Sequence, residues 1–513
     1  MMTLDKETCY RALRSRDPRF DGKFFTAVTS TGIYCRPVCP APTPKFENVT
    51  FFQCAASAEE AGFRPCRRCR PEAAPGTPAW NGTATSVARG MRLIEQGFLD
   101  DHSVDELATI LGMGGRHLRR LFLRHLGASP KAVDSTRKAH FAARLLAETD
   151  LPITAVALDA GYSSIRRFNE SFKKSFGRSP SEVRERRRSG RATAIASDRL
   201  TLRIAYRPPY DWDGILTFLK TRAIVGVESV EDGRYARSVQ VGGWTGVVEV
   251  SPEPGANALR VSMDASAGDS IGLIVEGIRR IFDLRSDPDA VAAHLSQDPL
   301  LRNLIEHSPG RRIPGVWDPF ESGVRALVGQ QISVIAAIRL LGRISALAGR
   351  PLAGREGANI RLLFPEPAEL AGADLSSIGM PETRRKSVRA VAAAVADGSL
   401  SFDHFESSEE FSERLCELPG IGPWSAEYIL LRGVGEPDAF PASDLGIRKA
   451  LTWRAREHAL SLGARRFDDT LIATNDVLAL AEKWRPWRGY AAIHLWQYLA
   501  TGQEQVKNKE SVL

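Results

Sequence analysis

Two stretches near the front of the chain, TGIYCRPVCP (residues 31–40) and GFRPCRRCRP (residues 62–71), carry cysteines in short pairs. The four cysteines are Cys35, Cys39, Cys66 and Cys69. Three residues separate the first pair, two separate the second, and 26 lie between the pairs. This spacing is typical of tetrahedral zinc sites, in which four thiolates bind one metal ion. It predicts a small, zinc-bound α/β domain over residues 1–75.

A thiolate held by a metal ion could attack a methyl group, because thiolate is the nucleophilic form of cysteine. On spacing alone, a zinc site that only folds the domain is the commoner interpretation. Clustered thiols in a reducing compartment favour metal binding over disulfides. The remaining cysteines, Cys9, Cys54 and Cys416, are expected to be ordinary packing residues.

Basic residues are concentrated in the front of the chain. Residues 1–85 carry 12 Lys and Arg against 8 acidic residues, residues 86–191 carry 20 against 12, and residues 192–513 carry 37 against 41. A positive field of this kind attracts a polyanion, and the motifs below favour nucleic acid. No apolar leader and no run of eighteen apolar residues is present, which predicts a cytoplasmic protein without a membrane partner.

Two stretches divide the chain into predicted domains. Residues 74–85 are rich in Pro, Gly, Ala and Thr, and residues 186–198 join an arginine run to small residues, a composition typical of linkers. A chain of 513 residues is expected to form several domains. We predict a multidomain α+β protein with domains over 1–75, 86–190, 199–275 and 276–505.

The second domain contains an internal repeat. Its first copy has Leu118, Phe122, Leu126, Gly127 and Pro130, and its second has Phe168, Phe172, Phe176, Gly177 and Pro180. Each copy follows a helical stretch that ends at a glycine, Gly112 or Gly161, and Ser103 with Glu106 has the spacing of a capping box. Helix, glycine turn and helix, twice over, predict an all-α domain of two helix-turn-helix units.

The second helix of each unit is basic on its predicted solvent face. The residues are Arg116, Arg119 and Arg120 in the first unit, and Arg166 and Arg167 in the second. They could reach base edges and phosphates in successive major grooves of double-stranded DNA. For one copy alone, a solvated basic face explains the pattern equally well. Two copies ending in F-x-x-x-(L/F)-G-x-S-P resemble the AraC-family DNA-binding domain.

The words around the cysteines, TGIYCRP and GFRPCRRCRP, resemble the Ada-type methyl-phosphotriester domain of bacterial alkylation-response proteins over residues 8–72. The resemblance implies one zinc ion on the four cysteines, and irreversible transfer of a methyl group from a DNA methyl phosphotriester to Cys35. Methylation would remove one negative charge from the centre, so DNA affinity should rise. The expected outcome is activation of particular promoters, with RNA polymerase as a partner.

One feature of several Ada proteins is missing. They end in a second methyltransferase domain whose active cysteine lies in a PCHR-type setting. Here Cys416 lies in SERLCELPG, which does not match that motif. We therefore predict no repair of O6-methylguanine by this chain.

The C-terminal half alternates apolar and polar residues over 199–275, which predicts an antiparallel sheet, and shows helical periodicity over 276–505. Between two helical stretches, LPGIG places Gly420 and Gly422 two residues apart. Such a hairpin beside a helix N-terminus can hold a phosphate with backbone N–H groups, as in a helix-hairpin-helix. A glycine-rich connection between helices is the plainer interpretation. A monovalent cation at the hairpin is a further candidate ligand.

Asp444 follows in AFPASDLGIRKA, where a carboxylate could stabilise positive charge on a sugar or activate water. Taken alone, its position suits a helix N-cap equally well. Together with RPPYDWDGILTFL, PGVWDPFESGVRALVGQQISV and KWRPWRGYAAIHLW, these motifs resemble 3-methyladenine DNA glycosylase II of the AlkA type over about 200–500. The resemblance implies a sheet subdomain with all-α helix-hairpin-helix domains, and Asp444 as the catalytic carboxylate for hydrolysing the glycosidic bond of alkylated purines.

Aromatic faces suit a flipped, cationic base. By matching position, the candidates are Trp424, Tyr428, Trp496 and Phe218, each of which could instead be core. Gln331 stands where the family inserts an apolar wedge into DNA, often a leucine. Leu445 replaces the tyrosine often found after the catalytic aspartate. Both departures predict altered DNA contact or substrate range.

These expectations combine into a bifunctional alkylation-damage protein that works on DNA as a monomer, associated with the nucleoid. One alternative is a transcription factor whose glycosylase-like half only binds DNA. Another is a glycosylase whose front half merely tethers it to DNA.

Overall fold

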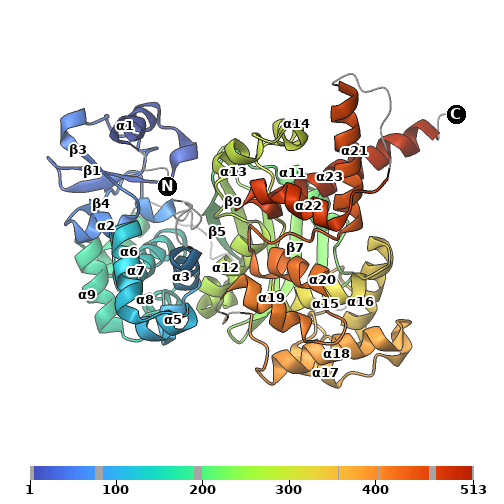
Figure 1. Ribbon diagram of the computed structural model, residues 1–513. Coiled ribbons are helices and arrows are strands. Elements are labelled where there is room, and N and C mark those ends of the chain that lie inside the picture. Colours follow the sequence, from blue (N-terminus) through green and yellow to red (C-terminus); the bar gives the residue numbers. More distant parts are fainter. Residues whose placement is uncertain are drawn as a thin grey trace. The chain divides into compact units, whose positions relative to one another are not determined.

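The computed structural model describes residues 5–74, 85–189, 199–355, 357–402, 405, 407–461 and 470–510. The chain forms two compact units (Figure 1). The first is built from residues within 1–208, 234–279 and 284–286, and the second from residues within 209–233, 280–283 and 287–513. The predicted linker over 74–85 falls almost wholly outside the described residues. Of the second predicted linker, residues up to Ser189 belong to a helix and the rest lies outside them.

The N-terminal domain is a small sheet with helices, as predicted. Its strands are β1 (Phe25–Val28), β2 (Ile33–Cys35), β3 (Val49–Phe52) and β4 (Arg64–Pro65), in the order β3-β1-β2-β4. Strand β1 is antiparallel to β2 and β3, whereas β2 is parallel to β4. Helices α1 (Lys6–Ser15) and α2 (Ala55–Glu60) and the short turns η1 (Pro18–Phe20), η2 (Phe46–Asn48) and η3 (Pro71–Ala73) complete it. The parallel pairing of β2 with β4 places the two cysteine pairs side by side.

The helix-turn-helix region is all-helical, which confirms that prediction. It comprises α3 (Thr85–Glu95), α4 (Phe98–Asp101), α5 (Val104–Ile110), α6 (Gly115–Leu126), α7 (Pro130–Glu148), α8 (Ile153–Asp159), α9 (Ile165–Phe176) and α10 (Pro180–Ser189). Ser103 and Glu106 form the predicted capping box. Gly112 and Gly161 have φ of +68° and +81°, a conformation that glycine adopts without steric cost, at the two predicted turns.

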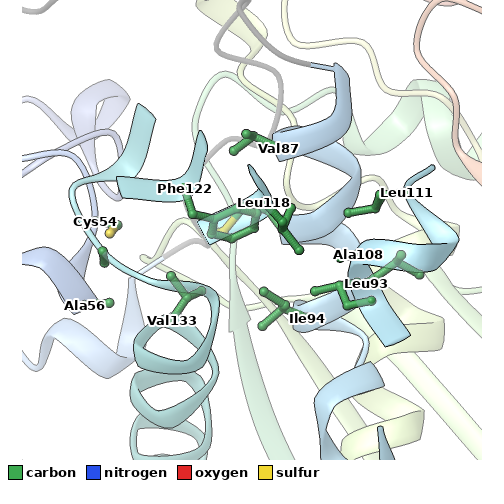
Figure 2. Packing of buried hydrophobic residues seen from close by; sticks show 13 residues of the cluster. Cys54, Ala56, Val87, Leu93, Ile94, Ala108, Leu111, Leu118, Phe122 and Val133 are labelled. Atoms are coloured by element: carbon green, nitrogen blue, oxygen red, sulfur yellow. The ribbon is translucent and has the colours of Figure 1, made fainter. Parts of the chain in front are cut away.

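The N-terminal domain and the first helix-turn-helix unit share one apolar core. Figure 2 shows Cys54 and Ala56 of the N-terminal domain beside Leu118, Phe122 and Val133, all of them buried. Cys9 is buried as well. Cys416 is exposed, so its prediction as a packing residue is wrong. It is the last residue of a helix whose buried residues are Phe411 and Leu415, which leaves Cys416 on the solvent side.

The predicted antiparallel sheet is confirmed. Strand β5 (Arg199–Ala205) pairs with β9 (Ala258–Asp264), β9 with β8 (Trp244–Pro252), and β8 with β7 (Arg234–Val241), all antiparallel. Exposed and buried residues alternate along β5, because successive side chains of a strand point to opposite faces. The turn η4 (Ala265–Ser270) and helix α12 (Ile271–Ile281) follow the sheet.

The described part of the second unit is mainly helical, as expected, with one short strand, β6 (Glu228–Glu231). Its first helices are α11 (Trp212–Lys220), α13 (Pro288–Leu295), α14 (Pro299–His307), α15 (Pro319–Gly329), α16 (Val334–Ala348), α17 (Pro367–Gly372) and α18 (Glu382–Ala396). Then come α19 (Ser408–Cys416), α20 (Pro423–Ile429), α21 (Leu445–Ser461), α22 (Thr474–Ala481) and α23 (Arg488–Glu510), with short turns η5 (Ser376–Ile378), η6 (Leu430–Val434) and η7 (Glu482–Trp484). Among the described residues, none of the helices has the length and apolar character that crossing a membrane requires.

Candidate functional sites

The four cysteines meet at one point in the N-terminal domain. The sulfurs of Cys35, Cys39, Cys66 and Cys69 all lie within 4.8 Å of one another. Four thiolates about 2.3 Å from a zinc ion in a tetrahedron would stand about 3.8 Å apart, so the spacing fits one metal ion. Cys39, Cys66 and Cys69 are buried, whereas Cys35 is partly exposed. Cys35 is therefore the least buried of the four cysteines.

The chemistry of this donor set also fits a cation. Hydrogen bonds among the crowded thiols lower the pKa of Cys66 and raise the pKa of Cys35 and Cys69. Without a cation, such a cluster cannot hold four negative charges. A zinc ion bound there would keep all four sulfurs as thiolates.

The side chain of Arg36 lies beside the cysteine sulfurs, and the sequence did not lead us to predict a role for it. The backbone N–H of Arg36 donates to the sulfur of Cys69 at 3.3 Å, and its guanidinium donates to the Cys69 carbonyl at 3.2 Å. The same guanidinium pairs with the carboxylate of Asp21, at 2.9 Å from Nε. The feature of the sequence that could have identified Arg36 is its position directly after Cys35 in the motif TGIYCRP. Arg36 ties the two cysteine pairs together and offsets part of their negative charge.

The predicted DNA-contacting arginines lie on the helices expected. Arg116, Arg119 and Arg120 on α6 and Arg166 and Arg167 on α9 are all exposed. Arg119 lies 3.7 Å from Asp105, and Arg166 lies 2.9 Å from Glu170, in solvent-exposed pairs. Exposed pairs of this kind are weak and can be exchanged for phosphate contacts.

The predicted hairpin forms between α19 and α20. Gly420 has φ of +80°, and the N–H of Ile421 donates to the carbonyl of Leu418 at 3.2 Å. Gly422 caps the N-terminus of α20. A Cβ atom at Gly420 would stand 2.2 Å from the hydroxyl of Ser387, whereas one at Gly422 would meet no atom within 4 Å. Gly420 is therefore required for its backbone conformation and for space, whereas no neighbouring atom requires a glycine at position 422.

The loop between α15 and α16 is tied to this hairpin. The side-chain amide of Gln330 donates to the carbonyl of Gly420 at 2.8 Å and to the hydroxyl of Ser425 at 3.0 Å. The next residue, Gln331, is exposed and has φ of +57°. Val334 and Ile335, which sequence reasoning did not single out, follow on α16 and are 42% and 66% exposed. Exposed apolar residues therefore lie within four positions of Gln331 along the chain.

Asp444 accepts three hydrogen bonds at the start of α21. The indole N–H groups of Trp424 and Trp496 donate to its two carboxylate oxygens, each at 2.9 Å. The backbone N–H of Ile447 also donates to Oδ1, at 2.9 Å. Asp444 therefore caps the helix and also lies among the aromatic residues, so the two interpretations of this residue are compatible.

The aromatic candidates gather around Asp444. Trp424 and Tyr428 stack with centroids 5.5 Å apart, and Trp496 lies 6.3 Å from Tyr428. Phe218 joins the group through Arg432, whose guanidinium lies 4.6 Å from the Phe218 ring and 5.5 Å from the Tyr428 ring. All four aromatic residues keep part of their surface exposed, so they are not closed core.

Two arginines in this group escaped the sequence analysis. Arg432 lies in the π-helical turn η6 and donates to the hydroxyl of Tyr428 at 2.7 Å, and Arg222 stacks 3.8 Å from the Phe218 ring. Burial raises the pKa of Tyr428, but the charges of Arg432 and Arg222 outweigh it and lower that pKa. For Arg432, the feature of the sequence that could have predicted this contact is its position four residues after Tyr428, a spacing that brings two side chains together on one face of a helix.

A cysteine centre for a metal ion, two helix-turn-helix units, and a helix-hairpin-helix region with an aspartate between two tryptophans define a DNA-binding protein with two chemical centres. Three family models match the chain. They are the metal binding domain of Ada over residues 8–72, a helix-turn-helix domain over 107–186, and the AlkA N-terminal domain over 201–318.

Curated relatives agree with these matches. The chain is 39% identical over 512 residues, 99% of both chains, to the "Probable bifunctional transcriptional activator/DNA repair enzyme AlkA" of Mycobacterium tuberculosis. It is 34% identical to "DNA-3-methyladenine glycosylase 2" of Escherichia coli, over 57% of this chain and 95% of that one. It is 36% identical to the "Bifunctional transcriptional activator/DNA repair enzyme Ada" of Escherichia coli, over 31% of this chain and 45% of that one. The chain belongs to the family of bifunctional transcriptional activator/DNA repair enzymes.

Proposed function

We propose that Cys35 is the methyl acceptor of an alkylation sensor. Its sulfur attacks the methyl carbon of a DNA methyl phosphotriester, and the bond from that carbon to the phosphate oxygen breaks. The phosphodiester leaves as an anion, and Cys35 becomes S-methylcysteine. Cys35, Cys39, Cys66 and Cys69 would hold the zinc ion, which supplies thiolate character when bound. The partial exposure of Cys35, against three buried partners, supports this assignment.

We propose that Asp444 is the catalytic carboxylate of an alkylpurine DNA glycosylase. The bond from C1′ to the purine breaks, and the base leaves with the electron pair, which neutralises a base that alkylation had made cationic. Water adds at C1′ and releases a proton. The Asp444 carboxylate stabilises the positive charge that develops on the sugar. Trp424, Tyr428 and Trp496 offer faces on which the flipped base could stack, with Phe218 at their edge.

The observation that carries this proposal is the pair of indole hydrogen bonds to Asp444. They orient both oxygens of the carboxylate and keep it beside the aromatic faces. The cap of α21 needs only the Ile447 N–H, and here two indoles also donate to the same carboxylate, one to each oxygen.

Release of free methylated purine from alkylated duplex DNA tests the proposal. Asp444→Asn keeps the size and one of the two acceptor oxygens but removes the charge, so release should fall to background. Asp298→Asn is a matched control, because Asp298 also caps a helix and accepts from an indole, that of Trp484, at 2.6 Å. Release by Asp444→Asn at the wild-type rate would refute the role of this carboxylate in the reaction. No release by the wild type would favour the alternative in which this half only binds DNA.

The DNA contacts remain proposals. Arg116, Arg119, Arg120, Arg166 and Arg167 would bind promoter DNA, while the hairpin at Gly420 and Gly422 and the loop at Gln331 would bind damaged duplex. A monovalent cation at the hairpin, RNA polymerase as a partner, a monomeric state and association with the nucleoid are finer predictions. The Gly420 carbonyl accepts a hydrogen bond from the side chain of Gln330.

A further inference from the structure

Tyr34 directly precedes Cys35 on strand β2, so the two side chains point to opposite faces of the sheet. Tyr34 is fully buried, and its ring packs edge-on against Phe25 with centroids 5.8 Å apart. Its hydroxyl donates to the carboxylate of Glu59 at 2.8 Å and lies 2.9 Å from Nε2 of His140. The residue beside the proposed methyl acceptor thus reaches out of the N-terminal domain.

Glu59, on α2, collects hydrogen bonds from two helices of the neighbouring domain. His140 and Thr136 on α7 lie 3.1 Å from its two oxygens, and the hydroxyl of Ser175 on α9 lies 3.4 Å away. Burial raises the pKa of Glu59, but the hydrogen bonds from His140, Tyr34 and Thr136 outweigh it and lower that pKa. We call Tyr34, Glu59, Thr136, His140 and Ser175 the Glu59 cluster.

The cluster ends on the second recognition helix. Ser175 is near the C-terminus of α9, and the His140 ring packs 5.9 Å from Phe176 on the same helix. Exposed Arg166 and Arg167 lie near the opposite end. A helix of 12 residues is a rod of about 18 Å, so a small tilt at Ser175 displaces the two arginines.

The apolar core that the two domains share does not determine this orientation by itself. That core joins the N-terminal domain to the first helix-turn-helix unit, through residues such as Cys54 and Phe122 (Figure 2). Apolar contacts are non-directional, whereas a buried carboxylate with several donors has one satisfactory geometry. The Glu59 cluster is a directional link between strand β2 and α9, the basic helix of the second helix-turn-helix unit, and all of these residues belong to the first compact unit.

We propose that the Glu59 cluster positions α9 relative to Cys35 and thereby carries part of the methyl-dependent gain in promoter affinity. This inference rests on the proposed role of Cys35 as methyl acceptor. A methyl group on Cys35 adds volume at a crowded group of sulfurs, so β2 has to adjust, and Tyr34 is the neighbouring residue on that strand. A shift of β2 moves the Tyr34 hydroxyl and, through its hydrogen bond, Glu59. Glu59 in turn is hydrogen-bonded to Ser175, so α9 moves with it.

The experiment compares the affinity of the full-length zinc protein for promoter DNA before and after stoichiometric methylation. Tyr34→Phe keeps the buried ring and removes the hydroxyl, and Ser175→Ala removes the hydroxyl on α9. We expect both variants to take up the methyl group at the wild-type rate, while the affinity ratio of methylated to unmethylated protein falls about fivefold. Mass spectrometry of the protein measures the uptake independently of DNA binding.

Two matched controls lie in the same domains. Tyr10→Phe removes a hydroxyl that donates to the carbonyl of Pro44 at 2.9 Å inside the N-terminal domain. Ser171→Ala removes a hydroxyl on α9 that accepts from Tyr162 at 3.2 Å inside the helix-turn-helix region. Both should keep the wild-type ratio, although each loses a hydrogen bond of similar kind.

The outcomes separate the two proposals. Normal methyl uptake with an unchanged ratio in Tyr34→Phe and Ser175→Ala would overturn the inference and leave the charge change at the sulfurs as the whole response. Absence of uptake in the wild type would overturn the role of Cys35 itself, and this inference with it. Should Tyr34→Phe not fold, Ser175→Ala alone decides, because it changes a partly exposed residue at the end of the cluster.

Discussion

Asp444 illustrates how one residue can serve structure and chemistry together. As a helix cap it accepts the Ile447 N–H, and as a candidate catalytic group it accepts the indoles of Trp424 and Trp496. The cap holds the carboxylate in place, and the indoles orient its two oxygens. Preorganised groups of this kind stabilise developing charge without rearrangement during the reaction.

Replacing Trp496 by Phe should slow base release. The variant keeps an aromatic face but loses the N–H that holds Oδ1 of Asp444. Loss of a hydrogen bond to a charged group predicts a fall in single-turnover release of about tenfold. Trp212→Phe, which removes an indole hydrogen bond to the Gly233 carbonyl at 3.2 Å, should leave the rate unchanged. Equal rates for Trp496→Phe and the wild type would mean that this indole does not orient the carboxylate.

Asp283 should make the second unit less stable as pH rises. Burial raises the pKa of its carboxyl to about 6, even though Tyr490 donates to it at 2.7 Å. The folded state therefore binds this proton more tightly than the unfolded state, whose value is 3.8. Stability from this group is complete below about pH 4 and falls by about 3 kcal/mol as the pH rises past 6.

Asp283→Asn cannot ionise and should not show this loss. Asparagine also tolerates the φ of +47° at this position. The melting temperature of the variant relative to the wild type should therefore rise between pH 4.5 and pH 7.5. A difference that stays constant across this range would show that Asp283 titrates normally in the folded protein.

At the scale of elements, the hairpin between α19 and α20 depends on its two glycines unequally. Gly420→Ala should weaken binding to damaged duplex DNA and lower stability by about 1–3 kcal/mol, because its φ is +80° and Ser387 leaves no room for a methyl group. Gly422→Ala has open space and keeps its N–H, so it should bind nearly as the wild type does. DNA affinity and thermal unfolding of both variants check this, and equal losses in the two would contradict it.

The regular elements were accessible from local patterns. The capping box at Ser103, the glycine turns at Gly112 and Gly161, and the alternation along β5 are all set by neighbours a few residues apart. The loop after α15 was only partly accessible. Gln331 was recognised by position, but the exposure of Ile335 depends on what α16 packs against, and no local pattern reports that.

At the scale of the whole molecule, the two chemical centres lie in separate compact units. Removing the metal by chelation should therefore abolish methyl uptake and weaken promoter binding, while release of alkylated purine continues. The reason is that metal binding supplies folding free energy to a small cysteine site. Both activities can be measured in one sample before and after dialysis, with zinc restored as the control. Methyl uptake that survives proven loss of the metal would refute the role of the metal in the cysteine centre.

By itself, the sequence determined the kinds of domain and their order, the four cysteines, the arginine-bearing helices, Asp444 and its aromatic neighbours. The cysteines and the arginine-bearing helices follow from spacing and periodicity, whereas Asp444 and its aromatic neighbours were located by the motifs that resemble the AlkA type. Only the tertiary structure decided that Glu59 joins Tyr34 to α9, and that Arg222 and Arg432 lie among the aromatic residues. It also placed the buried Arg207 against the Asp21 carbonyl at 2.9 Å. Such pairs join residues far apart in the chain, and a long-range contact leaves no periodic trace in the sequence from which it could be predicted.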